Sequence, residues 1–304
     1  MKSPHIPVLR DEIIELFSDV DGGYIVDCTV GYGGHSEAIL SANPNINMIC
    51  IDQDEEAINF SKERLKKFGD RVQFAKGRFS EVIGEFDNYD IRAILADIGV
   101  SSLQLDKKSR GFSFMSESLD MRMDSNSPLD ASIVVNSYSQ KDLEKIFREY
   151  GEVREYKKMA SLIVLERLKK PFESAKELSD FLSKHFYAKK IHPATLAFQA
   201  IRIEVNNELG ELKTLLQKVK NLQLNKCLVA IISFHSLEDR IVKQSFKEWS
   251  NSCICPPEAM RCLCGGDHQI GRVISKKPII PTGEEIARNP RSRSSKLRVF
   301  KISR

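Results

Sequence analysis

Short apolar runs alternate with helix-like segments over the first hundred residues of this chain. Two stretches, 35–42 and 55–68, have apolar residues at helical spacing. The runs around them read as strands, at residues 24–30, 47–52, 72–77 and 91–99. Strand–helix alternation at this spacing favours parallel strands joined by helical crossovers. We therefore expect an α/β fold with a doubly wound sheet, whose ligands bind beyond the carboxyl ends of the strands.

The pattern changes between residues 106 and 205, where helix-like segments follow one another without a convincing buried strand. The segments with helical periodicity are 141–150, 155–170 and 175–186. Strand character returns in three later runs, at 227–234, 271–279 and 295–302, and we expect the last two to pair. The simplest organisation is a helical domain, 106–205, inserted into an α/β domain whose two parts are 1–105 and 206–304.

Length and composition are those of a globular enzyme or binding protein. The 304 residues, 41% hydrophobic and 29% charged, suffice to bury a sizeable core. The start, MKSPHIPVLRDE, lacks the apolar segment of a secretory signal, and no apolar run approaches the ~20 residues of a membrane span. We therefore expect a cytoplasmic protein that does not enter membranes. The sequence leaves its oligomeric state open.

A glycine-rich stretch, VDCTVGYGGHS, follows the first expected strand and exposes its backbone to a ligand at Gly31, Gly33 and Gly34. S-adenosylmethionine (AdoMet) and a dinucleotide are the two serious candidates. The dinucleotide pattern G-x-G-x-x-G places a third glycine where Ser36 stands, and the carboxylate of Asp27 would repel a pyrophosphate. The stretch favours AdoMet over a nicotinamide dinucleotide, with a purely structural turn as the alternative.

Polar side chains follow the other expected strands. Asp52 ends the second strand, where a carboxylate can hold ribose hydroxyls of either ligand. Three further stretches carry polar or aromatic residues that do not fit a core strand or a linker: 95–106, 110–124 and 230–240. Parallel strands end at one edge of a sheet, so we expect these stretches to converge there.

Motifs of these stretches, with others along the chain, form an ordered series between residues 5 and 298: HIPVL, GYGGHS, DIGVSSLQLD, RGFSFM, LDMRMD, HPATLAFQAIRI, ISFHSLEDRIVK and NPRSRSSKLR. In this series the chain resembles the bacterial 16S ribosomal RNA cytosine N4-methyltransferases, the small-subunit methyltransferase H family. The resemblance implies a class I methyltransferase domain interrupted by a helical domain. It also implies AdoMet as methyl donor and a cytosine in the decoding centre of the small ribosomal subunit as the target.

By the same resemblance, AdoMet is held at positions that correspond here to Gly33, Gly34, His35, Asp52, Phe79, Asp97 and Gln104. Each has an ordinary structural alternative by itself. An aspartate shortly before a glycine at a strand end often caps a helix, as Asp97 could, and Phe79 is a core candidate by composition. Their position after the strands of a methyltransferase sheet favours the functional interpretation.

Methyl transfer to cytosine N4 requires hydrogen-bond acceptors, because the nitrogen lone pair is conjugated with the ring. Acceptors on its N–H groups favour a pyramidal, more nucleophilic nitrogen and help the proton to leave. Asp97 and Ser101, after the fourth strand, or His235, after the fifth, could be these acceptors. For His235 a structural role at the strand end is an equal alternative.

Two parts of the chain are expected to contact RNA. The aromatic residues Phe112 and Phe114 could form a lid that stacks on the base. From 286 to 304 the chain has seven Lys or Arg and no acid, and Arg291, Arg293 and Arg298 are the expected phosphate contacts. A solvated tail is the alternative for this segment. For the whole protein, the alternative to an enzyme is a non-catalytic RNA-binding assembly factor on a methyltransferase fold.

Four of the seven cysteines lie within twelve residues, in a C-x-C-x6-C-x-C pattern: Cys253, Cys255, Cys262 and Cys264. Four thiolates form a tetrahedral zinc site, so a structural zinc is one interpretation. The one-residue spacing within each pair is shorter than in most zinc sites. A reduced, exposed loop is therefore the alternative.

Overall fold

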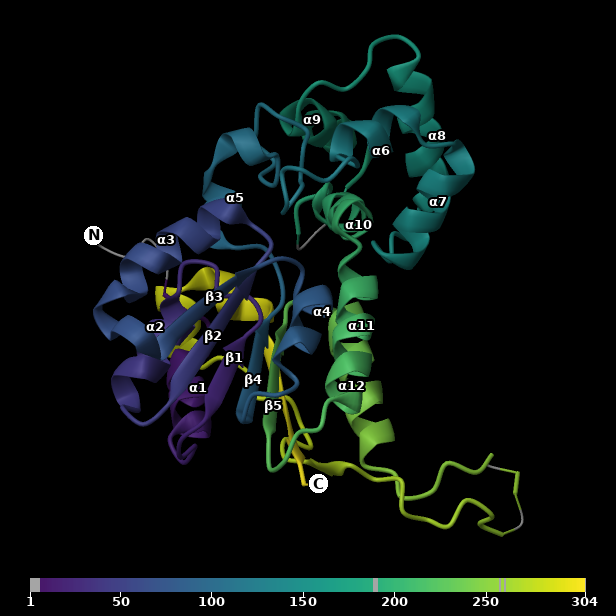
Figure 1. Cartoon of the computed structure of the whole chain (residues 1–304). Helices are drawn as coiled ribbons and strands as arrows, with labels where there is room; N and C mark the ends of the chain where they lie inside the picture. The colour runs from purple at the N-terminus through teal and green to yellow at the C-terminus, as the bar shows by residue number, and fades with distance from the viewer. Residues whose placement is uncertain (1–5, 188–190, 257, 260, 304) are drawn as a thin grey trace. The chain divides into compact units, whose positions relative to one another are not determined.

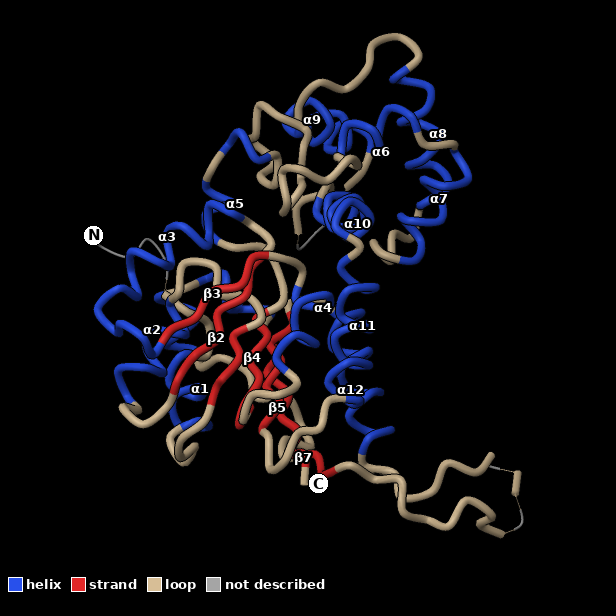
Figure 2. The backbone as a smooth tube through the Cα atoms, viewed as in Figure 1, coloured by secondary structure: helices blue, strands red, loops and turns tan. Residues whose placement is uncertain are grey.

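The computed structural model describes residues 6–187, 191–256, 258–259 and 261–303. It divides into two compact units. The first contains Met1–Gly99 and Glu211–Arg304, and the second contains Val100–Gly210. Figure 1 traces both units along the chain, and Figure 2 separates the strands of the first from the helices of the second.

The first unit is built on a mixed sheet, which among the described residues has the strand order β3-β2-β1-β4-β5-β7-β6. The strands are β1 (Tyr24–Asp27), β2 (Asn47–Asp52), β3 (Val72–Lys76), β4 (Ile91–Asp97), β5 (Leu228–Ser233), β6 (Gly271–Val273) and β7 (Lys296–Ile302). The first five run parallel, and β7 lies antiparallel between β5 and β6. This order confirms the expected doubly wound sheet, and β6 and β7 confirm the expected closing pair.

Alternate residues of the central strands enter two different cores. Ile25, Met48 and Leu95 face a core formed with α1 (Arg10–Phe17), α2 (Gly34–Ala42) and α3 (Glu55–Leu65). Val26, Ile49 and Ile94 face the opposite core, where α4 (Phe79–Val82), α11 (Glu208–Asn221) and α12 (Ser236–Trp249) pack. Burial on both faces explains why these strands read as continuous apolar runs in the sequence.

The second unit is helical. Its helices are α5 (Ser102–Asp106), α6 (Ala131–Ser137), α7 (Gln140–Glu149), α8 (Tyr156–Arg167), α9 (Ala175–His185) and α10 (Thr195–Asn206). Side chains of Asp130, Ser139 and Ser174 accept backbone N–H groups at the starts of α6, α7 and α9. The apolar faces of α6 to α10 form one core, with Phe147 and Ile163 fully buried. The helices α7, α8 and α9 therefore confirm the helical segments that the periodicity of the sequence predicts.

The smaller helix α13 (Gly283–Arg288) precedes the last strand of the first unit. None of the helices in the described part of the chain has the length and apolarity that a bilayer crossing needs.

Candidate active site

The glycine loop connects β1 to α2 and begins earlier than the sequence indicates, because β1 ends at Asp27 rather than near residue 30. Gly31 and Gly33 have left-handed backbone angles, with φ of 49° and 70°, which strain residues that have a Cβ. A Cβ on Gly34 would lie 2.6 Å from Cγ of Pro7. The loop thus requires glycine at each of these positions, for conformation at two and for space at the third.

Asp27 holds this loop from inside the protein. Its side chain is 1% exposed and accepts hydrogen bonds from the backbone N–H of Thr29, at 3.1 Å, and from the hydroxyl of Ser36, at 2.7 Å. Burial raises the pKa of this carboxyl, although the bond from Ser36 opposes the shift. Ser36, which stands where the dinucleotide pattern has its third glycine, therefore holds the carboxylate of Asp27 in place through this hydrogen bond.

Asp52 connects the end of β2 to the same loop. One carboxylate oxygen accepts the N–H of Gly31 at 2.8 Å, and the other accepts the N–H of Asp54 at 2.9 Å. Burial raises the pKa of Asp52 to about 6 despite these bonds. Because a carboxylate oxygen has two lone pairs, each can still accept a hydroxyl group.

His35 and Asp97 meet beside the glycine loop, at the start of α2 and the end of β4. Nε2 of His35 lies 3.5 Å from Oδ2 of Asp97. Among the described residues, both ring nitrogens of His35 and Oδ1 of Asp97 are buried without a hydrogen-bond partner. The backbone N–H of Asp97 donates to Oγ1 of Thr29 at 2.8 Å, which fixes the strand end against the loop. Buried polar atoms without partners are rare, so this group of atoms indicates a ligand site.

Phe79 begins α4, three residues after the end of β3 at Lys76 and two after Gly77. Its ring is half-buried and packs against the core of the first unit. The structure thus gives Phe79 a packing role, and its contact with AdoMet, which the family resemblance implies, stays a prediction.

His235 caps α12. Its Nδ1 accepts the N–H of Glu238 at 3.4 Å, and the Glu238 carboxylate accepts the N–H groups of Phe234 and His235, at 2.8 and 3.2 Å. With Nδ1 accepting, a neutral ring carries its proton on Nε2. That nitrogen is then a donor, so in this state His235 is not suited to accept a proton from N4.

A cavity of about 350 Å³ opens beside His235 in the first unit. Its lining includes Arg293 and Lys296 from the basic C-terminal segment, together with Phe234, Ser236 and Ser295. The guanidinium of Arg293 is suited to contact phosphate here, whereas the ammonium of Lys296 also lies 3.5 Å from Oδ2 of Asp239.

Arg298, which the sequence predicts as a phosphate contact, is buried and paired with an acidic side chain. It is 7% exposed, and its guanidinium donates to both carboxylate oxygens of Asp239, at 2.6 and 3.2 Å. Burial raises the pKa of the Asp239 carboxyl, but the hydrogen bonds and charge of Arg298, together with the nearby Lys296, outweigh it and lower that pKa. Arg298 therefore has a structural partner, and we leave it out of the proposed RNA contacts.

Four of the candidate residues belong to the second unit. Ser101 and Gln104 cap α5 reciprocally, with the Ser101 N–H donating to Oε1 of Gln104 at 3.0 Å and the Gln104 N–H donating to Oγ of Ser101 at 3.3 Å. Phe112 is 7% exposed and belongs to the helical core. Phe114 is half-buried and stacks on His192, with ring centroids 4.5 Å apart. Of these two aromatic residues, only Phe114 has a side chain exposed enough to stack on a base.

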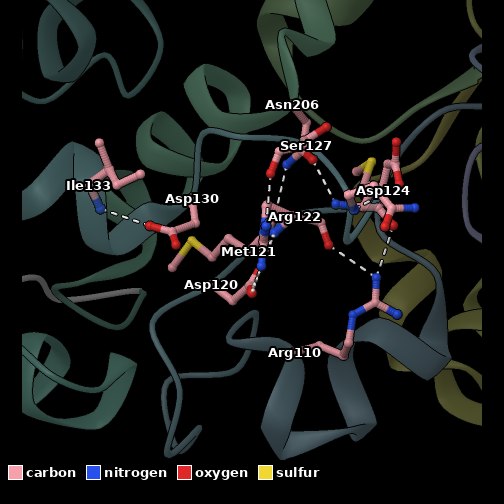
Figure 3. A network of polar contacts seen from close by, with 11 residues as sticks. Arg110, Asp120, Met121, Arg122, Asp124, Ser127, Asp130, Ile133 and Asn206 are labelled. Atoms are coloured by element: carbon pink, nitrogen blue, oxygen red, sulfur yellow. Dashed lines mark hydrogen bonds and ion pairs between the residues drawn. The ribbon is translucent and has the colours of Figure 1, made fainter.

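Polar contacts order the loop that follows α5 (Figure 3). Arg110 donates to the carbonyls of Arg122 and Met123, at 3.0 and 2.9 Å, and the side chain of Asn206 binds Met121 and Met123. The sequence gives no signal for this network, which joins residues more than 80 positions apart. The LDMRMD motif is thus held in shape from within its own unit.

The four clustered cysteines lie in the loop between α12 and β6, and their sulfur atoms all lie within 4.8 Å of one another.

Comparison with known proteins identifies the family. The sequence profile described as "MraW methylase family" matches residues 2–303. The chain belongs to this family. A relative from Aliarcobacter butzleri is 62% identical to this chain over 302 residues, which cover 99% of this chain and 100% of the relative. Relatives from Sulfurimonas denitrificans and Wolinella succinogenes are 60% and 58% identical, each over 99% of both chains. All three are named "Ribosomal RNA small subunit methyltransferase H".

These findings confirm the family predicted from the motifs and the class I methyltransferase fold. The cofactor of the methylase is AdoMet, so the interpretation as a nicotinamide-dependent oxidoreductase is wrong. The residues at the site fit this cofactor. Atoms of His35 and Asp97 that have no hydrogen-bond partner lie beside the loop, and the glycines of the loop leave its backbone uncovered. On the first unit, Gly33, Gly34, His35, Asp52 and Asp97 would hold it. For Phe79 and Gln104, contact with the cofactor stays a prediction.

Proposed function

We propose that this methylase transfers a methyl group from AdoMet to N4 of a cytosine in the decoding centre of 16S ribosomal RNA. The names of the relatives support ribosomal RNA of the small subunit as substrate. The motif series from residue 5 to residue 298 supports cytosine N4 as the acceptor. The buried His35–Asp97 pair beside the glycine loop is the observation that carries the proposal.

Methyl transfer to N4 needs alignment of the nitrogen with the methyl group and a hydrogen-bond acceptor for its N–H groups. A strong base is less important. Bound AdoMet supplies a methyl group on a positively charged sulfur. Asp97 is the best-placed acceptor for an N4 proton, because its Oδ1 is without a partner and its backbone is fixed by Thr29. Ser101 is the second candidate. We assign His235 to positioning, since its Nδ1 caps α12.

Access to a base in structured RNA requires unstacking, at a cost of roughly a few kcal/mol. Phosphate contacts from Arg293, which lines the cavity beside His235, would offset that cost. Arg291 is a further candidate in the same segment, and Phe114 is the proposed stacking side chain.

The test uses small ribosomal subunits from a strain that lacks this enzyme. Subunits and naked 16S RNA are each incubated with the purified protein and AdoMet, and the digested nucleosides are analysed by mass spectrometry. We expect N4-methylcytidine in one of the two substrates and none when AdoMet is omitted. Methylation of a different atom would overturn the N4 assignment. RNA binding without methyl transfer, by protein that binds AdoMet, would support the non-catalytic assembly factor instead.

A further inference from the structure

The cysteine cluster is a feature that methyl transfer does not use. The segment lies between α12 and β6 and, in Figure 1, extends from the end of α12 as a long loop. Its described residues from 251 to 270 contain neither helix nor strand. The loop is closed at its base by backbone bonds from Ile270 to Trp249, at 2.9 Å, and from His268 to Ser252, at 3.0 Å. Beyond this base, the thiols are the feature most able to hold its shape.

The sulfur positions match a tetrahedral tetrathiolate. With zinc–sulfur bonds of about 2.3 Å, the sulfurs of such a site lie about 3.8 Å apart. Here Sγ of Cys253 lies 3.6 Å from Sγ of Cys262 and 3.7 Å from that of Cys264, while the last two are 3.5 Å apart. Sγ of Cys255 completes the set within 4.8 Å. These separations are well beyond the ~2.05 Å of a disulfide bond.

Backbone N–H groups support the sulfurs in a reciprocal pattern. Ile254, between the first two cysteines, donates to Sγ of Cys264 at 3.4 Å. Leu263, between the last two, donates to Sγ of Cys255 at 3.2 Å. Each short C-x-C turn thus directs its central N–H to a sulfur of the other pair. N–H donors stabilise thiolate ligands, and this pattern shows how one-residue spacing can bring all four sulfurs together.

The loop has little apolar burial of its own to keep this arrangement. The side chains of Ile254 and Leu263 are 64% and 77% exposed, and two of the four cysteines are exposed as well. Small segments without a core are commonly held by a metal or by disulfides. In a reducing compartment, a metal is the favoured cross-link.

We propose that Cys253, Cys255, Cys262 and Cys264 bind one Zn²⁺ in a closed tetrathiolate site. Four protein ligands leave no open coordination position, so the ion has a structural role and takes no part in methyl transfer. It would fix the loop that separates α12 from the strands β6 and β7. This inference stands independently of the proposed RNA target.

The experiment uses full-length protein prepared without chelator and without a metal-affinity tag. Elemental analysis should give one zinc per chain, and Cys262→Ser should lose it, while the matched loop variant Glu258→Gln keeps it. Replacement of zinc by Co²⁺ should produce the visible absorption of a tetrahedral thiolate complex. Thiol titration of the native protein should show four groups that react only after metal is removed.

Three results would overturn the site: zinc far below one per chain with four freely reactive thiols, two disulfides by mass spectrometry of protein prepared anaerobically, or stoichiometric iron in place of zinc. Circular dichroism of Cys262→Ser separates loss of metal from loss of fold, since only the loop should change. If that variant fails to fold, metal content and thiol protection of the unmodified protein still decide the matter.

Discussion

Nε2 of His35 lies 3.5 Å from Oδ2 of Asp97, although 62 positions separate the two residues in the chain. The imidazole comes from the first turn of α2 and the carboxylate from the end of β4. Because neither His35 nitrogen has a hydrogen-bond partner among the described residues, the pair is prepared to bind a ligand group.

Asp97→Asn should lower methylation of ribosomal RNA by roughly 10²- to 10³-fold, because the amide accepts the N4 proton poorly while keeping the shape of the side chain. N4-methylcytidine measured by mass spectrometry is the readout. The control is Asp90→Asn, at the opposite end of β4, where the exposed carboxylate pairs with Arg92. Normal methylation by the Asp97 variant would remove this residue from the mechanism.

Asp52→Asn should weaken AdoMet binding by about 1.5–3 kcal/mol, the range for a charge-assisted hydrogen bond. The variant keeps the side-chain volume, which limits disturbance of the loop at Gly31. Calorimetry measures the affinity, with Glu55→Gln on the exposed start of α3 as the control. An unchanged dissociation constant would show that Asp52 serves only to shape the loop.

The pKa of Asp52, raised by burial to about 6, predicts opposite effects of pH on binding and on stability. AdoMet affinity should fall as the pH is lowered from about 7.5 to about 5, because the carboxylate that we propose as the acceptor of the ribose hydroxyls becomes protonated. The contribution of this group to stability is fully present below its unfolded pKa and is lost as the pH rises through about 6. Comparison with Asp52→Asn isolates both effects, since the amide does not titrate.

Arg291→Ala combined with Arg293→Ala should lower the affinity for ribosomal RNA and reduce its dependence on salt, by about 0.7 in the logarithmic slope for each lost phosphate contact. AdoMet binding should be unaffected. The matched control replaces two exposed lysines of α12, Lys243 and Lys247, by alanine. Equal salt slopes for the two double variants would mean that the basic segment has no special role in binding.

Arg298→Ala should act on stability instead. It removes the closer of two cationic partners from the partly buried carboxylate of Asp239, which keeps Lys296 at 3.5 Å, so we expect a loss of about 1.5–3 kcal/mol. Thermal or denaturant unfolding provides the measurement, and replacement of the exposed Arg293 by alanine serves as the control. If Arg298→Ala unfolds like the native protein while its RNA affinity falls, the arginine contacts RNA after all.

Local sequence determined the elements of this protein. Apolar runs predicted β1 to β5, helical periodicity predicted α7 to α9, and the glycine pattern predicted a ligand loop after the first strand. The position of Asp27, Asp52 and Asp97 at one sheet edge also followed from the sequence, because parallel strands must end on the same side. These features depend on periodicities of two to four residues, which a single sequence displays directly.

Only the tertiary structure decided which side chains have partners. Asp27 became a buried anchor for Ser36, His235 a helix cap, and Arg298 the partner of Asp239. The last of these contacts joins residues 59 positions apart, and the bond between Thr29 and Asp97 spans 68. Such contacts leave no periodic trace in the chain, because they form only when strands and helices pack. Whether a charged side chain is free to bind RNA or is already paired therefore depends on the packing of the whole unit.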